Sequence, residues 1–279
     1  MTTTKQELVE GLRVQAQHVR EAILRMVYAA NSGHCGGSLS AADIVTALYF
    51  HIMRIDPQHP SWEDRDRFIL SKGHACPVLY SALALRGYFP QEELGTLRAM
   101  DSRLQGHPDM RKTPGLDATT GSLGQGLSLG VGMALGAKLG GKAYRVYVLM
   151  GDGETNEGQI WEAAACAVKY RLDNLVAIVD KNGLQNDGPT DAIMPMGSLA
   201  EKWRAFGWDV VEIDGHDMAQ IVGALDEAKE RSHGKPTAII AKTVKGKGVS
   251  YMENVVEWHS GAPTDMELDI ALAEIWKGR

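Results

Sequence analysis

An aspartate between two glycines stands directly after an apolar run, and an asparagine stands directly after the next such run. The first run is YRVYVLM, which is followed by Gly151, Asp152 and Gly153. The second is LVAIVDK, which is followed by Asn182. A carboxylate at the end of a buried strand is costly to bury unless it meets a cation. The pattern therefore raises the question of which cation Asp152 meets.

One carboxylate and one amide form too weak a cage for a metal ion that only protein atoms hold. They are sufficient for Mg²⁺ when a diphosphate supplies further oxygens. Gly151 and Gly153 let the backbone approach such oxygens, and the helix expected after them points its free N–H groups the same way. An isolated Gly-Asp-Gly is usually a turn, but Asn182 after a second buried strand favours a site for Mg²⁺ and a diphosphate.

The elements that position these residues alternate between apolar strands and helices. Continuous apolar strands between helices indicate an α/β fold with a doubly wound, mainly parallel sheet and helices on both faces. No linker or repeat divides the chain, which predicts a single domain over 1–279 with an N-terminal helical arm, 5–31, packed on it. The strands are predicted at 67–71, 145–150, 175–180, 209–213 and 236–242. The helices are predicted at 5–30, from Ser40 onward, and at 77–87, 122–140, 158–171, 198–206 and 217–231.

Ligands of such sheets bind beyond the carboxyl ends of the strands. Asp152 and Asn182 leave two strands at that edge, and His74 follows a third, RFILSKG. We therefore expect these three side chains to lie near one another. The helix at 122–140 is rich in glycine, and pairs of its glycines stand four residues apart, so one face would let another backbone come close. The pairs are Gly126 with Gly130, and Gly132 with Gly136.

Composition excludes several classes of protein. The formal net charge is −6, so no basic field invites nucleic acid or a membrane surface. No apolar run approaches the ~20 residues of a membrane span, and the N-terminus lacks the apolar core of a signal peptide. The three cysteines are widely spaced, which argues against a disulfide framework or a CxxC metal site. These features predict a cytoplasmic protein with reduced thiols.

The segment from Gly151 to Asn182 resembles the thiamine diphosphate signature: Gly-Asp-Gly, a helix, a strand and then Asn. Further segments, in the same order along the chain, resemble the N-terminal, diphosphate-binding part of the transketolase family. These segments are SGHCGGSLSAADI (32–44), RDRFILSKGHA (65–75), GHPD (106–109), TTGSLGQGLSLGVGMA (119–134), KNGLQNDGPT (181–190), KTVKGKGVSYMEN (242–254) and WHSGAP (258–263).

This resemblance implies two cofactors, thiamine diphosphate and Mg²⁺, with Ca²⁺ or Mn²⁺ as substitutes for the metal. Asp152, Asn182 and the backbone carbonyl of Leu184 would ligate the metal, and diphosphate oxygens and a water would complete the octahedron. The positions that match cofactor contacts of the family are His74, Gly121, Leu123, Gly151, Asp152, Gly153, Glu154, Asn182 and His259.

The resemblance also implies a set of residues that handle the reacting sugar. His34 and His107 match histidines that face the substrate, which suits a site that must bind hydroxyls and move protons. His74 and His259 match histidines that touch the diphosphate or the sugar. Glu157 matches a residue near the catalytic glutamate at the subunit boundary, and it completes the predicted catalytic set.

Three positions depart from the family pattern. Cys35 stands in place of the proline of HPGG, which would make that turn less rigid. Asn186 stands where an apolar residue usually packs on the thiazolium. Ser260 follows His259 where the family has glycine, which puts the placement of that histidine in question.

The remaining basic residues carry weaker signals. His216, in IDGHD, is expected to be a loop residue without a role in the site. A phosphate contact and a solvated or interface loop are equally plausible for the lysines of KTVKGKG, namely Lys242, Lys245 and Lys247. Surface or satisfied polar positions are expected for His18, His51, His59 and His233. Cys35 and Cys76 are expected to be small packing residues.

A full-length transketolase would continue beyond this sequence into the domain that binds the aminopyrimidine ring and carries the catalytic glutamate. We therefore expect a partner: a separate C-terminal subunit with that domain, in an α₂β₂ assembly. The expected reaction transfers a two-carbon ketol unit from a ketose phosphate to an aldose phosphate. The arginines that grip the acceptor phosphate would also lie on the partner.

Three alternatives remain open at this stage. The α subunit of a 2-oxo acid dehydrogenase decarboxylase would suit GDGETNEGQIWEA nearly as well, although the histidine loops and WHSGAP favour transketolase. A 1-deoxyxylulose-5-phosphate synthase fragment is disfavoured by differences around the glycine-rich helix. A non-catalytic cofactor-domain scaffold or regulator is disfavoured because Asp152 and Asn182 are both present.

Overall fold

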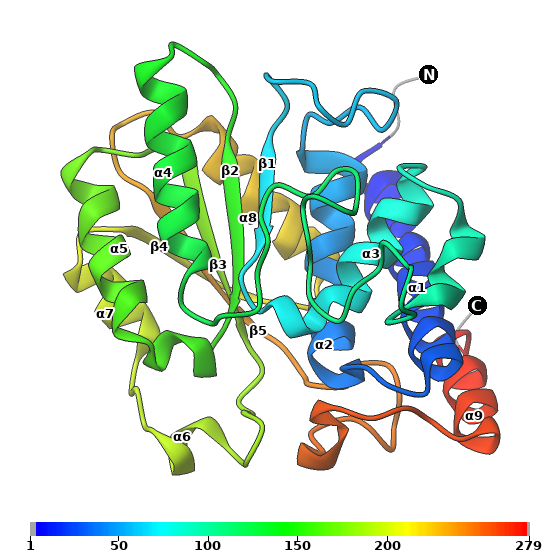
Figure 1. Cartoon of the computed structure of the whole chain (residues 1–279). Coiled ribbons are helices and arrows are strands. Elements are labelled where there is room, and N and C mark those ends of the chain that lie inside the picture. Colours follow the sequence, from blue (N-terminus) through cyan, green and yellow to red (C-terminus); the bar gives the residue numbers. More distant parts are fainter. Residues whose placement is uncertain (1–3, 278–279) are drawn as a thin grey trace.

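The computed structural model describes residues 4–277. Five strands form one sheet, and every neighbouring pair runs parallel, in the order β1-β2-β3-β5-β4 (Figure 1). The predicted α/β fold with a doubly wound parallel sheet is confirmed. The strands are β1 (Arg67–Leu70), β2 (Val146–Gly151), β3 (Leu175–Lys181), β4 (Asp209–Asp214) and β5 (Thr237–Lys242).

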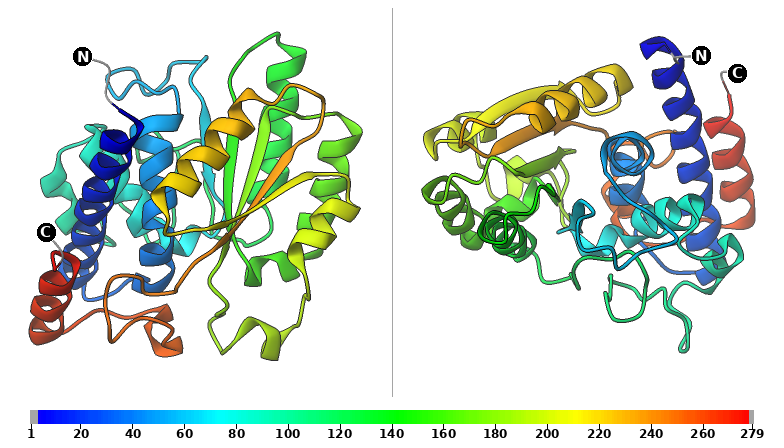
Figure 2. Two further views of the ribbon diagram at one scale, coloured as in Figure 1. Left: turned by 180° about the vertical axis from the view of Figure 1, so that it is seen from behind. Right: turned by 90° about the horizontal axis from the view of Figure 1, so that it is seen from above.

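Helices cover both faces of the sheet, as Figure 2 shows from behind and from above. One face is covered by α4 (Gly126–Leu139), α5 (Gly158–Lys169) and α7 (Leu199–Ala205). The other is covered by α2 (Cys35–Ala47), α3 (Cys76–Arg86) and α8 (Met218–Glu230). Outside α2 and α3 lies α1 (Lys5–Ala30), and α9 (Asp265–Ile275) runs beside it.

Short helical turns connect the main elements and carry several residues of interest. They include a π-helical turn, η1 (Leu48–Ile52), and the short helix α6 (Thr190–Ile193). The 3₁₀ turns are η2 (Gly73–Ala75), η3 (Gln91–Thr96), η4 (Gly153–Asn156) and η5 (Val256–His259).

The central strands are buried on both faces, which explains their continuous apolar sequences. The side chains of β2 from Val146 to Met150 and of β3 from Leu175 to Val179 are almost completely buried. They alternate between two hydrophobic clusters, one under α2, α3 and α8 and the other under α4, α5 and α7. The sheet is therefore a rigid layer, and its carboxyl edge presents residues in a fixed register.

Local sequence signals set the ends of α1. Thr4 caps its start with a capping box, because the Thr4 hydroxyl accepts from the N–H of Glu7 and the Glu7 carboxylate accepts from the N–H of Thr4. Asn31 ends the helix in a left-handed conformation, with φ of 46°. The predicted helix 5–30 is confirmed, and this helix packs on α2 and α3.

The second helix starts earlier than predicted. It begins at Cys35, and Ser40 lies in its second turn instead of at its N-terminus. Ser40 donates a hydrogen bond to the Asp180 carboxylate, at 2.6 Å, and Asp43 pairs with Arg20. The prediction that this helix begins at Ser40 was wrong because tertiary contacts carry the helix through Gly36 and Gly37.

The glycines of α4 divide into two kinds. A Cβ on Gly126 would lie 2.3 Å from Ser71 Oγ, and one on Gly130 would lie 2.5 Å from Val148 Cγ2. These two glycines let α4 approach β1 and β2 closely, as the predicted glycine pair requires. Gly132 and Gly136 instead have open space at the Cβ position. The close approach therefore involves one glycine pair and not the other.

Of the helices in residues 4–277, none is both long enough and apolar enough to cross a membrane.

The two kinds of glycine on α4 give a matched pair of substitutions. We expect Gly130→Ala to lower the free energy of unfolding by roughly 1–3 kcal/mol, because the new methyl group overpacks the contact with buried Val148. Gly132→Ala should raise it by up to about 1 kcal/mol, because alanine favours the helix and meets no neighbour. Urea unfolding of both variants measures the difference, and equal effects would contradict this account of α4.

Candidate cofactor and metal site

A cavity of about 280 Å³ lies at the carboxyl ends of the central strands. In Figure 1 this is the lower end of the sheet, near α6. Most of the residues predicted from the sequence line it. The lining residues are Gly37, Lys72, His74, Leu123, Gly151, Asp152, Gly153, Glu154, Asn156, Glu157, Asn182, Leu184, Gln185, Asn186, Lys245 and His259.

Asp152 follows β2 and is only 4% exposed. One carboxylate oxygen accepts from the N–H of Gly153 at 2.9 Å, and the other accepts from the N–H of Gly183 at 2.7 Å. Burial raises the pKa of Asp152 to about 6. No ion pair joins its carboxylate to any residue in 4–277. Its charged form therefore lacks a protein counter-ion in direct contact.

Asn182 and Leu184 line the same cavity as Asp152. The loop after β3 turns sharply at Gly183, whose φ is 78°, and an antiparallel bridge between Leu184 and Pro189 closes it. The Asn182 side-chain oxygen accepts from the N–H of Leu184 at 3.1 Å, which orients the amide. The Gly183 N–H that binds Asp152 links this loop directly to the end of β2.

These residues fit a magnesium ion that a diphosphate shares. Among the residues that the structure describes, no three His, Cys, Asp or Glu side chains gather as a metal site. The candidate donors are instead one carboxylate, one amide oxygen and one backbone carbonyl, all hard oxygen ligands suited to Mg²⁺. A divalent ion would also supply the positive charge that buried Asp152 lacks. The set is complete only with oxygens from a bound ligand.

A buried ion pair lies beneath this cavity. The Lys72 ammonium donates to the Asp180 carboxylate and, at 2.6 Å, to the carbonyl of Gly37. Asp180 also accepts from the hydroxyls of Ser40 and Thr243. Burial acts to raise the pKa of Asp180, but the Lys72 charge and these hydrogen bonds hold it below its usual value. Lys72 lines the cavity, and its charge is paired with that of Asp180.

A second buried lysine, Lys245, lines the same cavity and is 2% exposed. Its ammonium contacts the carbonyls of Leu184 and Gln185, at 3.1 and 3.0 Å, and the Nδ1 of His259, at 2.7 Å. Burial, and then the charge of Lys72, lower the pKa of Lys245 to about 8. The sequence left open a phosphate contact or a solvated or interface loop for Lys245, and its burial shows that a solvated loop is wrong.

Glu154 is buried, and its side chain forms hydrogen bonds with three segments of the chain. Its carboxylate accepts from the Ser71 hydroxyl, from the N–H of Gly124 at 3.0 Å and from the N–H of Gly151 at 3.1 Å. Burial raises its pKa. Both of its oxygens are thus used within the chain, so Glu154 supports the cavity wall by holding the loop before α4 against the ends of β1 and β2.

Three of the predicted histidines form one cluster at the cavity. The ring centroids of His34 and His74 lie 5.2 Å apart, those of His74 and His259 5.2 Å, and those of His34 and His259 5.5 Å. Burial is the main cause that lowers the pKa of each, to about 4 for His34, about 2 for His74 and about 4 for His259. All three rings are therefore neutral near pH 7 and can both donate and accept hydrogen bonds.

His107, Gly121 and Leu123 lie on the loops around this cluster. His107 is exposed, and its ring packs closely on Gly121: a Cβ at Gly121 would lie 3.1 Å from the ring. Gly121 has a φ of 143°. Burial and then Arg98 lower the pKa of His107. Leu123 is 37% exposed and lines the cavity, and Glu157 lies exposed at its rim as the N-cap of α5.

The other residues singled out by sequence fall into two groups. Asn186 is exposed on the cavity lining, and Ser260 is exposed just after η5. Cys35 and Cys76 are buried, which confirms them as packing residues. His216 lies outside the cavity, with one ring nitrogen 2.8 Å from Asp43 and the other accepting from the N–H of Val244.

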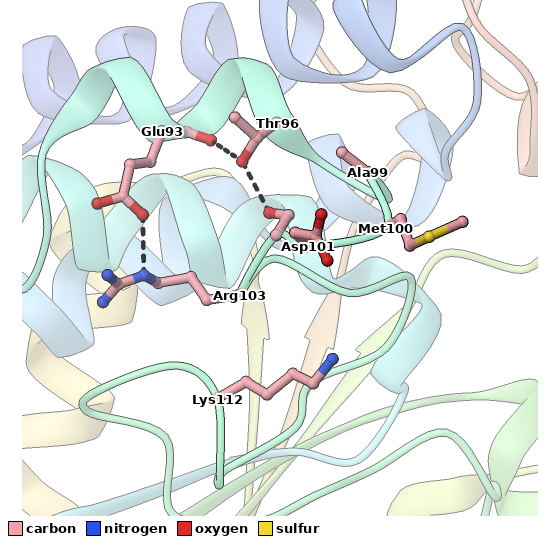
Figure 3. A pocket seen from close by; sticks show the side chains of 8 residues that line it. Glu93, Thr96, Ala99, Met100, Asp101, Arg103 and Lys112 are labelled. Atoms are coloured by element: carbon pink, nitrogen blue, oxygen red, sulfur yellow. Dashed lines mark hydrogen bonds and ion pairs between the residues drawn. The ribbon is translucent and has the colours of Figure 1, made fainter.

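A larger surface hollow, about 730 Å³, lies on the loop that follows η3 (Figure 3). Its charged and polar side chains are partly paired among themselves: Arg103 with Glu93 at 2.8 Å, and Thr96 with Ser102 at 2.7 Å. Met100 is 92% exposed at its edge. The hollow holds none of the predicted site residues, so size alone does not identify the functional cavity.

The sequence model of one protein family matches residues 12–276, and its description is "Transketolase, thiamine diphosphate binding domain". The chain belongs to the transketolase family. The predicted family is thus confirmed, and the cavity described above lies in a domain that the family uses to bind thiamine diphosphate.

Curated relatives support this assignment. The chain is 49% identical to the 6-deoxy-6-sulfo-D-fructose transketolase subunit of Clostridium sp. strain MSTE9, and the match covers 95% of this chain and 96% of the relative. It is 46% identical to an apulose-4-phosphate transketolase subunit from Phocaeicola vulgatus, over 96% of this chain and 94% of the relative. Human transketolase is 44% identical over 91% of this chain, which spans only 40% of that protein.

Solved structures of transketolases share the fold. A mutant transketolase from Pichia stipitis superposes with a TM-score of 0.90 at 33% sequence identity, covering 95% of this chain and 40% of that one. The enzyme from Campylobacter jejuni superposes with a TM-score of 0.88 at 34% identity, covering 95% of this chain and 42% of that one. This chain therefore spans about two fifths of these single-chain enzymes.

Sequence reasoning missed the two residues that form the buried ion pair and undervalued Lys245. Lys72 stands in SKGHA and Asp180 in VDKNG, and both lie next to residues that were singled out. Lys72 could have been found from its position, because it directly follows a buried strand and stands two residues before His74, a predicted site residue. Asp180 could have been suspected because a carboxylate within an apolar strand needs a partner.

The neutral histidine cluster predicts how stability depends on pH. An unfolded histidine titrates near 6.5, whereas the pKa of His74 in the folded chain is about 2, so the unfolded state binds more protons below pH 6.5. Stability from neutral His74 is therefore present above pH 6.5 and is lost as pH falls toward 2. Between pH 7.5 and 5.0 the free energy of unfolding should fall by about 2 kcal/mol less in His74→Gln than in the parent.

The control for this measurement is His233→Gln, because His233 is exposed and lies away from the cavity. Urea unfolding at both pH values gives the comparison. An identical pH dependence in His74→Gln and the parent would contradict the buried, neutral state of His74.

The buried ion pair gives a second prediction. Replacing Lys72 with methionine leaves the Asp180 charge buried without its counter-ion, so the free energy of unfolding should fall by roughly 3–5 kcal/mol. Arg204→Met, which removes one partner of an exposed pair with Glu212, should change it by less than about 1 kcal/mol. Thermal and urea unfolding of both variants test the contrast. Similar losses of unfolding free energy would contradict the stabilising role of the buried Lys72–Asp180 pair.

Proposed function

We propose that this chain is the diphosphate-binding subunit of a two-component transketolase that uses thiamine diphosphate and Mg²⁺. With its partner it transfers a two-carbon ketol group from a ketose to an aldose. The observation that carries this proposal is Asp152: a buried carboxylate without a protein counter-ion, beside the oxygens of Asn182 and Leu184 and a cluster of neutral histidines.

The chain's own residues divide the work of holding the cofactor. Asp152, Asn182 and the Leu184 carbonyl ligate Mg²⁺, for which Ca²⁺ or Mn²⁺ can substitute. Lys245 offsets part of the negative charge of the diphosphate, whereas the charge of Lys72 is already paired with Asp180. A second set of residues shapes the cofactor's surroundings: Gly121, Leu123, Gly151, Gly153 and Glu154. Glu154 does so through its hydrogen bonds to the backbone.

Bound thiamine diphosphate supplies a nucleophilic carbon for attack on the ketose carbonyl. The histidines of this chain bind the sugar and move its protons. Because His34 and His74 are neutral, each has one ring nitrogen that can donate a hydrogen bond to a hydroxyl and one that can accept. The Nδ1 of His259 already accepts from Lys245, so His259 donates to a hydroxyl through Nε2. His107 extends this set toward solvent, and Glu157 completes it at the rim, where the partner subunit joins.

The proposed partner is a C-terminal subunit with the pyrimidine-binding domain, in an α₂β₂ assembly. Relatives that this chain covers over 94–96% of their length are named as transketolase subunits, which supports a partner. Their names describe one sulfonated and one phosphorylated ketose, which supports a donor ketose with a terminal anion such as a phosphate. A cytoplasmic location and a single domain over 1–279 complete the proposal.

The metal site is tested by replacing the Asp152 carboxylate with an uncharged amide of the same shape. We expect Asp152→Asn to weaken Mg²⁺-dependent binding of thiamine diphosphate by about 100-fold or more, because even outer-sphere groups cost 10–100-fold when removed. The matched control is Asp187→Asn on the same loop, since Asp187 is exposed and donates no proposed ligand. Calorimetry with and without Mg²⁺ measures both, and unaltered binding by Asp152→Asn would sink the proposed metal site.

The reaction is tested by reconstitution with a candidate partner. Ketol transfer to an aldose should require this chain, the partner, thiamine diphosphate and Mg²⁺ together. Complete transfer by the isolated chain would overturn the two-component proposal. Lipoyl-dependent decarboxylation of a 2-oxo acid, with no ketol transfer, would favour the dehydrogenase α subunit, and absence of any cofactor binding would favour a scaffold.

A further inference from the structure

The short loop after β5, residues 243–247, carries Lys245 to the cavity, and we call it the Lys245 loop. Hydrogen bonds to neighbouring elements hold the residues around Lys245. The Thr243 hydroxyl donates to buried Asp180, and the N–H of Gly246 donates to the carbonyl of Gly36 at 3.0 Å. These bonds fix both ends of the loop to β3 and α2.

His216 holds the middle of the Lys245 loop. The N–H of Val244, directly before Lys245, donates to His216 Nε2 at 2.8 Å. On the other side of the ring, His216 Nδ1 lies 2.8 Å from a carboxylate oxygen of Asp43. Because Nε2 must accept, the ring carries its proton on Nδ1 and donates it to Asp43. The imidazole is thus a rigid bridge between α2 and the loop.

Asp43 anchors this bridge firmly. Its two carboxylate oxygens accept from Arg20, at 2.9 and 2.6 Å, in a bidentate pair between α2 and α1. The Arg20 guanidinium also donates to the carbonyl of Lys247, at 3.2 Å, so the same arginine reaches the loop directly. Both members of the pair are buried. The anchor therefore combines α1 and α2 into one support.

On the cavity side, the Lys245 side chain has little freedom. A Cβ on Gly36 would lie 3.0 Å from Lys245 Cγ, so the lysine stem passes directly over the first turn of α2. Its ammonium ends between the Leu184 carbonyl and His259 Nδ1. A small shift of the loop would move this charge away from both contacts.

We propose that His216 is a positioning residue for Lys245: by accepting the Val244 N–H while bound to Asp43, it fixes the lysine charge at the diphosphate cavity. The use of that charge rests on the function proposed above, but the mechanical link does not. His216 lies outside the cavity and touches neither the cofactor nor the substrate in this role.

Amide hydrogen exchange tests the link directly in the full chain without cofactor. His216→Phe keeps a ring but removes the acceptor, so exchange in 243–247 should become about tenfold faster, while 237–242 in β5 stays unchanged. His216→Gln keeps an acceptor at the reach of Nε2 and should restore slow exchange. His216→Asn is too short to reach Val244 and should behave like His216→Phe.

A double-mutant cycle tests whether His216 acts through Lys245. We expect His216→Phe to weaken binding of thiamine diphosphate with Mg²⁺ about tenfold and Lys245→Met to weaken it more. The double variant should bind no worse than Lys245→Met alone, because the lost positioning no longer matters. His233→Phe, at an exposed histidine away from the cavity, is the matched control and should bind like the parent.

The outcomes separate the two proposals. Unchanged exchange in 243–247 for His216→Phe, or fully additive losses in the cycle, would overturn the positioning role of His216. Unchanged binding in Lys245→Met would overturn the proposed use of Lys245 in the cofactor site. In that case the exchange experiment still decides whether His216 holds the loop.

Discussion

The site depends on how one buried negative charge is compensated. Asp152 directly follows β2 and is only 4% exposed, and its carboxylate accepts from the backbone N–H groups of Gly153 and Gly183. Beneath it, Asp180 is paired with Lys72, whereas Asp152 forms no ion pair with any residue that the structure describes. These two neighbouring aspartates therefore differ in how the chain compensates their charge.

The supports of the cavity come from elements far apart in sequence. Ser40 and Asp43 on α2 contact the ends of β3 and, through His216, the Lys245 loop. Glu154 joins the ends of β1 and β2 to the loop before α4. Ser40, Asp43 and Glu154 are buried, His216 is partly buried, and all four are hydrogen-bonded within the chain, which favours one arrangement of the cavity before a ligand binds. Such preorganisation lowers the cost of binding.

The sequence was informative where a residue's role follows from its position along one element. Strand limits were correct within about two residues, and Asp152 and Asn182 lie together because parallel strands end at a common edge. It failed where the role depends on packing. The start of α2 was misplaced because Gly36 and Gly37 do not favour a helix by themselves. These glycines allow the side chains of Lys245 and Lys72 to pack closely against the helix, which only the tertiary structure shows. For the same reason, Lys72 was missed and the role of Lys245 was left open.

The pairing of α1 with α9 has a consequence for synthesis of the chain. The side chain of Gln17 donates to the carbonyl of Ile275, which lies 258 positions later. Ribosomes add about 5–20 residues per second, so α1 waits for roughly 10–50 seconds before this neighbour exists. During that interval the positions of α1 that pack on α9 stay exposed to solvent.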